Sequence, residues 1–210
     1  QSILAKSGHI NHKYLKESES DKKAVIVVTA NRGLAGGYNS NITRMIIDEG
    51  FTKENTVVYA VGKKGRELLE RKGYEIKADY SEAINDPIYK DAKEICDDVL
   101  SAFADGEVGE IYLAYTVFKN TVVHEPQLIR LLPVEADDAA HETDGSEALM
   151  TYEPSEEEAL DMIIPKYVCS LVYGALIESV ASENGARMQA MDSATSNAEE
   201  MISTLSLKYN

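Results

Sequence analysis

The chain has 210 residues, of which 44% are hydrophobic, and this is enough for one α/β core of ordinary size with an extension. Its net charge of −15 disfavours nucleic acid and anionic lipid as partners, whereas basic or polar proteins stay possible. Because there is no run of eighteen apolar residues and no leader-like start, we expect neither a membrane span nor a secretory signal.

The first predicted element is a weakly helical segment at residues 1–17, which starts without a cap or a methionine. We interpret it as the remnant of a longer N-terminal helix. A charged linker at 18–23 follows. The β-branched run Ala24–Ala30 then predicts a strand buried on both faces, which is typical of a parallel sheet.

Strands and helices alternate through residues 18–134. Further strands are predicted at 56–62, 74–78, 110–118 and 127–134, and helices at about 40–49, 63–72 and 87–104. The last strand is bounded by Pro126 and Pro133, which suits an edge of the sheet. The pattern predicts a doubly wound, mostly parallel, Rossmann-like α/β sheet.

Residues 135–154 interrupt this alternation. The stretch 135–161 contains eleven Asp or Glu side chains and no Lys or Arg. It lacks the ligand spacing and the glycine of a calcium loop, so we expect an acidic, solvated loop that leads into a helix.

The region 155–210 is predicted to be one long helical arm. With Pro165 in its first turn, a helix to Leu207 would have about 43 residues and a length of about 64 Å. Its small and thioether side chains repeat with a heptad-like period, which predicts a coiled-coil seam. The seam residues are Gly174, Ile177, Ala181, Asn184, Met188, Met191, Thr195, Ala198, Ile202, Leu205 and Tyr209.

Two interpretations of this arm stay open. It is either a core helix of a larger helical domain or one arm of an antiparallel coiled coil whose other arm precedes Gln1. The exposed seam would also allow a scaffold protein that dimerises through the helix.

The Gly-rich turn at residues 31–39 follows a strand and precedes a helix, where a phosphate would dock in a nucleotide-binding protein. However, Gly33, Gly36 and Gly37 do not form the dinucleotide pattern, and no Lys-Ser or Lys-Thr pair follows. We therefore expect a tight turn with positive φ angles. The alternative is a nucleotide- or flavin-binding enzyme that uses this loop.

The histidines and cysteines do not predict a catalytic or metal site. His9 and His12 are expected at the surface, and His124 and His141 have no nucleophile or second base at a recognisable spacing. Cys96 and Cys169 are 73 positions apart in apolar helical segments, so we expect reduced packing residues. The sequence predicts no cofactor.

Four blocks carry a resemblance to a known family. They read TANRGLAGGYNSN at 29–41, YTVFKNT at 115–121, YEPS at 152–155 and ARMQAMDSATSNA at 186–198. In this order, and over nearly the whole chain, they resemble the gamma subunit of F-type ATP synthases.

The resemblance implies a non-catalytic rotor subunit on the cytoplasmic face of an energy-transducing membrane. An α/β foot would contact the membrane c ring and the epsilon subunit, and a two-helix shaft would enter the alpha-beta hexamer. It assigns Tyr152 and Glu153 to the foot near the c ring. It also implies that Arg187, Met188 and Met191 face the acidic lever region of the beta subunits.

The resemblance also implies that parts of the family's helices are absent at both ends of the chain. The family's first helix does not precede Gln1, and the chain stops at Asn210, before the segment that fills the bore of the hexamer. We therefore expect this chain by itself to be unable to couple rotation to catalysis.

Overall fold

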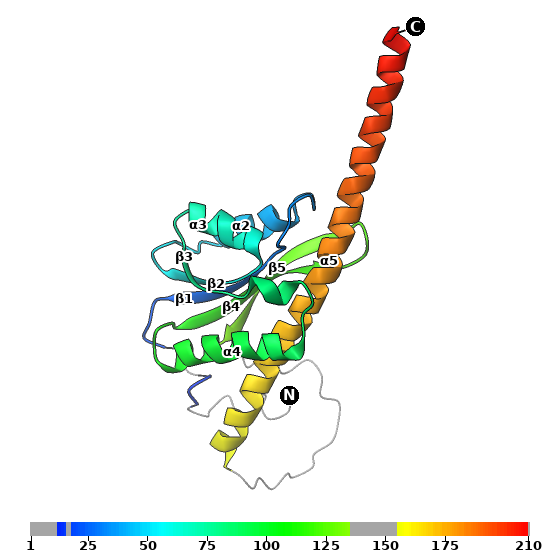
Figure 1. Cartoon of the computed structure of the whole chain (residues 1–210). Helices are drawn as coiled ribbons and strands as arrows, with labels where there is room; N and C mark the ends of the chain where they lie inside the picture. The colour runs from blue at the N-terminus through cyan, green and yellow to red at the C-terminus, as the bar shows by residue number, and fades with distance from the viewer. Residues whose placement is uncertain (1–11, 16–17, 135–154, 210) are drawn as a thin grey trace.

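The computed structural model describes residues 12–15, 18–134 and 155–209. Its elements follow one another as a strand–helix alternation that ends in a very long helix (Figure 1). In chain order they are β1 (Lys23–Val28), α2 (Tyr38–Asp48), β2 (Thr56–Val61), α3 (Lys63–Arg71), β3 (Glu75–Asp79), the 3-10 helix η1 (Ser81–Ile84), α4 (Tyr89–Ala104), β4 (Glu110–Phe118), β5 (His124–Leu132) and α5 (Glu156–Tyr209).

The five strands form one sheet in the order β3-β2-β1-β4-β5. β1 pairs in parallel with both β2 and β4, β2 pairs in parallel with β3, and β5 is antiparallel to β4. β2 and β3 follow on one side of β1, and the chain then crosses to the other side of β1 to form β4 and β5. The predicted doubly wound, mostly parallel sheet is therefore confirmed.

Side chains from β1 enter both layers of the core. Val25 and Val27 pack with residues of α2 and α3, whereas Ala24, Ile26 and Val28 pack with residues of α4 and α5. All five are fully buried. A continuous β-branched run is what a central strand with two covered faces requires, because neither face can be polar.

β5 is an edge strand, as its prolines predicted. It begins at His124, three residues earlier than expected, so that Pro126 lies inside it opposite Thr116 of β4. A proline is tolerated there because an edge strand has one side without a ladder.

The placement of Pro165 in the first turn of α5 was predicted wrongly. The helix begins at Glu156, and Pro165 lies inside it. The upstream turns are helical because Leu160 and Ile164 are fully buried in the core, which outweighs the hydrogen bond that the proline removes. With 54 residues, α5 is about 81 Å long.

α5 lies along the sheet with its first half and then projects far beyond it (Figure 1). One face of the first half packs against α4 and the sheet. The apolar residues of that face are Leu160, Ile164, Val168, Val172, Ala175 and Leu176. From Met191 to Tyr209 every residue is exposed, so this end of α5 is not buried against the sheet domain.

By length and composition alone, α5 would also be able to cross a membrane. Its apolar residues between Leu160 and Leu176 are instead buried in the protein core. The helix therefore has the properties of a core helix that continues into a projecting rod.

The segment 12–15 lies beside the foot of α5. His12 is only 1% exposed, so its predicted surface position was wrong. The Tyr14 amide donates to Nδ1 of His12 (3.2 Å), which leaves the Nε2 hydrogen to be donated to Asp161 of α5 (2.9 Å). Both ring nitrogens of His12 therefore have a hydrogen-bond partner, which allows the ring to be buried. No local sequence pattern indicated this, because Asp161 is 149 positions away.

Candidate functional site

The Gly-rich segment at residues 31–37 forms a tight loop after β1, as predicted. Gly36 has a φ of 58° and Leu34 has a φ of 62°, so two residues adopt left-handed backbone. A leucine rarely adopts this conformation, because its Cβ approaches the carbonyl oxygen. The loop therefore stays in a strained shape that neighbouring contacts must maintain.

The loop borders the point where the strand order reverses, between β1 and β4. In open α/β sheets, ligands bind in the crevice at this switch point. Here α5 fills it: Ala186 packs against Ala30, Ala35 and Tyr38. The remaining cavity, between the loop, η1 and α5, has about 130 Å³, whereas ligand pockets typically have at least ~300 Å³.

A larger open groove of about 450 Å³ lies on the other side of the loop. It is bordered by the loop, the β4–β5 hairpin and α5, and no Lys or Arg lines it. A phosphate group would find no Lys or Arg partner there, and His124 is the one basic side chain among the lining residues. The groove therefore lacks the charge that a nucleotide site needs.

Arg187 joins α5 to the Gly-rich loop. Its Nη1 donates to the carbonyl oxygen of Gly33 (2.5 Å), and its Nε and Nη2 donate to Glu183, one helical turn earlier. The side chain of Arg187 is 23% exposed and that of Glu183 is 17% exposed. The guanidinium that was expected to face another subunit is thus already bound within this chain.

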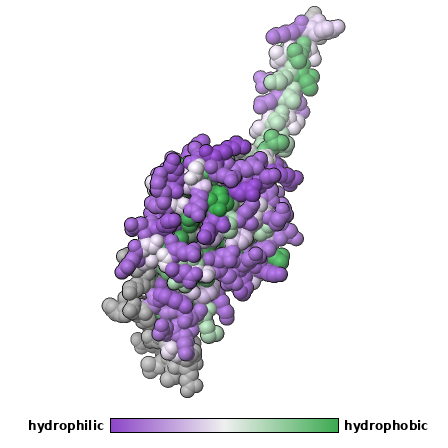
Figure 2. All heavy atoms as spheres, turned by 60° about the vertical axis from the view of Figure 1, so that its left-hand side comes forward, coloured by the Kyte–Doolittle hydropathy of each residue, from purple (hydrophilic) through white to green (hydrophobic). Residues whose placement is uncertain are grey.

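The predicted seam lies on the face of α5 that points away from the sheet. All its members are exposed, from Gly174 through Ile177, Met188 and Met191 to Tyr209. Figure 2 shows hydrophobic side chains along the projecting rod. Large apolar residues with exposures of 64% to 66%, such as Ile202 and Leu205, are unusual on a solvated helix and indicate a surface to be covered.

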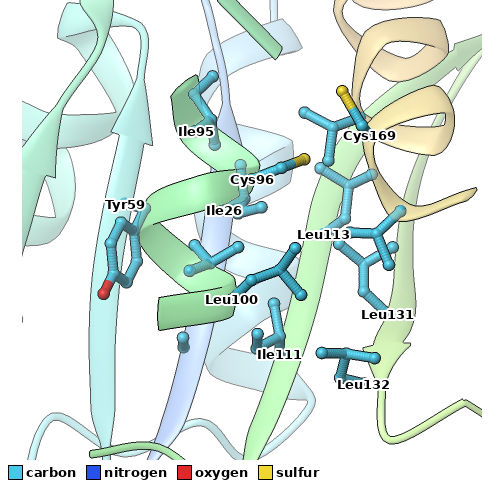
Figure 3. Close-up of a cluster of buried hydrophobic side chains, with 14 of the residues drawn as sticks. Ile26, Tyr59, Ile95, Cys96, Leu100, Ile111, Leu113, Leu131, Leu132 and Cys169 are labelled. Carbon is cyan, nitrogen blue, oxygen red and sulfur yellow. The ribbon is translucent and has the colours of Figure 1, made fainter. Parts of the chain in front are cut away.

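Cys96 of α4 and Cys169 of α5 are neighbours in the core (Figure 3). Both are free and buried, as predicted for packing residues. Burial, and next the adjacent Cys169 thiol, raises the pKa of Cys96 well above its usual range. The Cys96 thiol therefore has little thiolate character.

Comparisons with known proteins agree with this arrangement. The ATP synthase family model matches residues 1–210. An ATP synthase gamma chain from Lachnoclostridium phytofermentans is 63% identical over 214 residues, covering 99% of this chain and 74% of that one. A gamma chain from Acetobacterium woodii, described as sodium ion specific, is 40% identical over 99% of this chain and 74% of its own length.

The chain belongs to the ATP synthase gamma chain family.

Two solved structures share the fold of this gamma family member. The central stalk and c ring of the Tetrahymena thermophila mitochondrial ATP synthase gives a TM-score of 0.64 at 23% identity, with 92% of each chain covered. The rotor of the Euglena gracilis mitochondrial ATP synthase also gives 0.64, at 17% identity, over 100% of this chain and 85% of that one.

Family membership identifies a non-catalytic subunit of the synthase. The alternative of a nucleotide- or flavin-binding enzyme is not supported. The physical reason is visible at the Gly-rich loop, because the crevice that would hold the nucleotide is occupied by α5.

Sequence reasoning missed several residues that hold α5 at the loop and at β4. The Tyr38 hydroxyl donates to the Ser179 carbonyl (3.0 Å), and the Ser182 hydroxyl donates to the Thr116 carbonyl (3.2 Å). Each bond links residues at least 66 positions apart. The only signal was the run of small residues on the buried face of α5, which allows close approach.

Several predicted residues lie outside the described part of the chain. These are His9, His141, Tyr152 and Glu153, together with most of the 1–17 segment and the acidic loop at 135–154. Within the described part, no group of three or more His, Cys, Asp or Glu side chains is placed to hold a metal ion.

Proposed function

We propose that this gamma chain is part of the central rotor that couples proton flow through the membrane c ring to ATP synthesis in the alpha-beta hexamer. The observation that carries the proposal is α5. A helix of about 81 Å, packed on the sheet domain at one end and exposed from residue 191 onward, has the shape of a shaft on a foot.

The two faces of α5 support this proposal. The face from Leu160 to Leu176 is satisfied within the chain, whereas the seam face is not. A rod with an uncovered apolar seam gains stability only when a second helix or another subunit covers it, since isolated helices are marginal in water. In a coiled-coil shaft within the hexamer, a second helix and the surrounding subunits would both cover this seam.

The proposed division of the chain follows from this. Residues 18–134 form the foot domain, and residues 155–210 form one shaft arm. Residues 1–17 are assigned to the other arm, and residues 135–154 to an acidic loop. Tyr152 and Glu153 are proposed to contact the c ring and the epsilon subunit. The complex would lie on the cytoplasmic face of the energy-transducing membrane.

The contact with the beta subunits is assigned to the exposed residues of the shaft just above the loop. Met188 and Met191 are 52% and 42% exposed and available for an adaptable contact. Arg187 is proposed to add charge complementarity to the acidic lever region. Its bonds to Glu183 and Gly33 favour Met188 and Met191 as the main contact residues.

The test is a reconstituted synthase whose gamma chain carries this sequence in the matching 74% of the Lachnoclostridium phytofermentans gamma chain. In proteoliposomes, ATP should drive acidification that a proton ionophore abolishes. ATP hydrolysis without ion transport would contradict coupling. Transport that requires sodium would contradict the proton assignment while it leaves the rotor role intact.

A further inference from the structure

The upper contact between α5 and the sheet domain differs in kind from the lower one. Below Leu176, the contact of α5 with α4 and the sheet is mainly apolar, and the hydrogen bond between His12 and Asp161 joins the helix to segment 12–15. Between Ser179 and Arg187, three hydrogen bonds connect it to three different segments of the domain. Hydrogen bonds are directional, so they restrict the orientation of a helix in addition to the restriction from side-chain packing.

We propose that Tyr38, Ser182 and Arg187, here called the exit clamp, are positioning residues that fix the angle at which α5 leaves the sheet domain. Tyr38 reaches α5 from the start of α2, Ser182 reaches back to β4, and Arg187 reaches the Gly-rich loop. The Gly-rich loop leads directly into α2, whereas β4 is a separate strand, so the helix is bonded to two separate parts of the domain.

Burial strengthens two of the three bonds. Tyr38 is 5% exposed, and the backbone oxygen that it reaches belongs to Ser179, which is fully buried. Ser182 is fully buried as well. Water cannot replace a lost partner easily at such positions, so breaking either bond would leave an unsatisfied group. These two bonds form the inner part of the exit clamp.

Arg187 is the outermost member of the exit clamp. Glu183 accepts hydrogen bonds from Nε and Nη2 and thereby orients the guanidinium, and Nη1 donates to the carbonyl oxygen of Gly33. The Gly33 carbonyl lies in the loop with the left-handed Leu34, so the same bond helps to hold the strained loop. Arg187 therefore stabilises both the helix direction and the loop that borders it.

The position of the exit clamp gives it leverage. The rod beyond it, from Met191 to Tyr209, has 19 residues. At 1.5 Å per residue it is about 29 Å long, so a tilt of about ten degrees at its base would move its end by about 5 Å. A small change in the angle of α5 at Arg187 would thus produce a large displacement of the far end of the rod.

The exit clamp is tested in the 210-residue chain, without any other subunit. Two nitroxide labels are placed on exposed positions by Glu70→Cys on α3 and Ser203→Cys on the rod. The buried native thiols stay unlabelled under native conditions. Pulsed electron spin resonance then gives the distribution of distances between the foot and the rod.

Arg187→Gln should widen this distribution on the order of twofold, because the rod amplifies small tilts. Arg187→Lys, which still donates one hydrogen bond, should give an intermediate width. Arg71→Gln removes the same charge from α3 and should leave the width unchanged. An equal width for Arg187→Gln and the parent would overturn the proposal for Arg187.

Tyr38→Phe is the second, independent variant and removes a single hydroxyl. It should also widen the distribution, and combined with Arg187→Gln it should widen it further. Circular dichroism separates wider motion from loss of helix. Any contribution of the exit clamp to torque rests on the proposed function. The distance measurement does not depend on that function. A failed ion-transport test would therefore leave the outcome for the exit clamp intact, and the reverse also holds.

Discussion

The imidazole of His124, at the start of β5, lies against Gly185 of α5. A Cβ on Gly185 would stand 2.7 Å from Cε1 and 3.2 Å from Nε2 of the ring. The ring also packs against Phe118, at 5.9 Å between centroids. The β4–β5 hairpin thus lies directly on the helix backbone at this point.

Gly185→Ala should therefore destabilise the chain, although alanine favours helix. Gly174, in the same helix, has open space where its Cβ would stand, so Gly174→Ala is a matched control. We expect Gly174→Ala to raise the free energy of unfolding by up to ~1 kcal/mol, and Gly185→Ala to lower it by ~1 kcal/mol or more. Urea titration of both variants measures this. Equal stabilisation by both would show that the hairpin contact does not constrain position 185.

Tyr38→Phe should cost about 1 kcal/mol of unfolding free energy, because the Ser179 carbonyl loses its buried donor. Tyr209→Phe changes a side chain that is 94% exposed and should be neutral. Denaturant titration at pH 7 tests both variants. A Tyr38→Phe variant as stable as the parent would mean that water or another group replaces the hydroxyl.

The cost of Tyr38→Phe should depend on pH at the alkaline end. Burial raises the pKa of Tyr38 in the folded chain above its ordinary value, so unfolding favours the ionised form. The advantage of the parent over Tyr38→Phe is therefore full below the unfolded pKa of about 10 and declines as pH rises further. An advantage that grew above pH 10 would contradict the sign.

Asp161→Asn should weaken the attachment of segment 12–15 to α5. Burial raises the pKa of Asp161, but hydrogen bonds from Lys13 and His12 outweigh it, so the pKa is lowered in the folded chain. The stabilisation is then fully present above the unfolded pKa of about 4 and is lost as pH falls below it. Acid unfolding followed by circular dichroism, with Asp48→Asn as the control, should show a gap at pH 6 that narrows as the pH falls below about 4. A gap that is constant with pH would contradict the account.

Cys96 and Cys169 should react slowly with a thiol reagent in the native state, because both are buried and the pKa of Cys96 is raised. An added surface thiol, from Ser203→Cys, provides the comparison in the same molecule. We expect its rate to exceed theirs by on the order of 100-fold or more, and the difference to vanish in urea. Native cysteines that reacted as fast as the added one would disprove their burial.

The mostly parallel sheet and the edge position of β5 were predictable because each strand carries a local signal. The run at Ala24–Val28 can only be a strand covered on both faces, and the prolines beside β5 suit only an edge. The period of the proposed seam on α5 is also a local signal within one helix, and its pairing with a second helix stays a prediction. Its exposure on the face opposite the sheet agrees with the interpretation as a surface awaiting a partner.

Contacts between distant segments were not predictable. Nothing near Arg187 in the sequence indicates that its guanidinium meets Gly33, 154 positions away. His12 was expected at the surface because its partners, Tyr14 and Asp161, become neighbours only after folding. Pro165 was taken for a helix start because the burial of Leu160, which stabilises the earlier turns, depends on α4 and the sheet.

The rotation of the foot with the shaft is the central claim, and a single-molecule experiment tests it most directly. The synthase with the chimeric gamma chain is fixed to a surface through its alpha-beta hexamer, and a bead is attached to α3 through Glu70→Cys. On addition of ATP, the bead should revolve continuously in one direction. A bead that keeps a fixed angle while ATP is hydrolysed would contradict the rotor account.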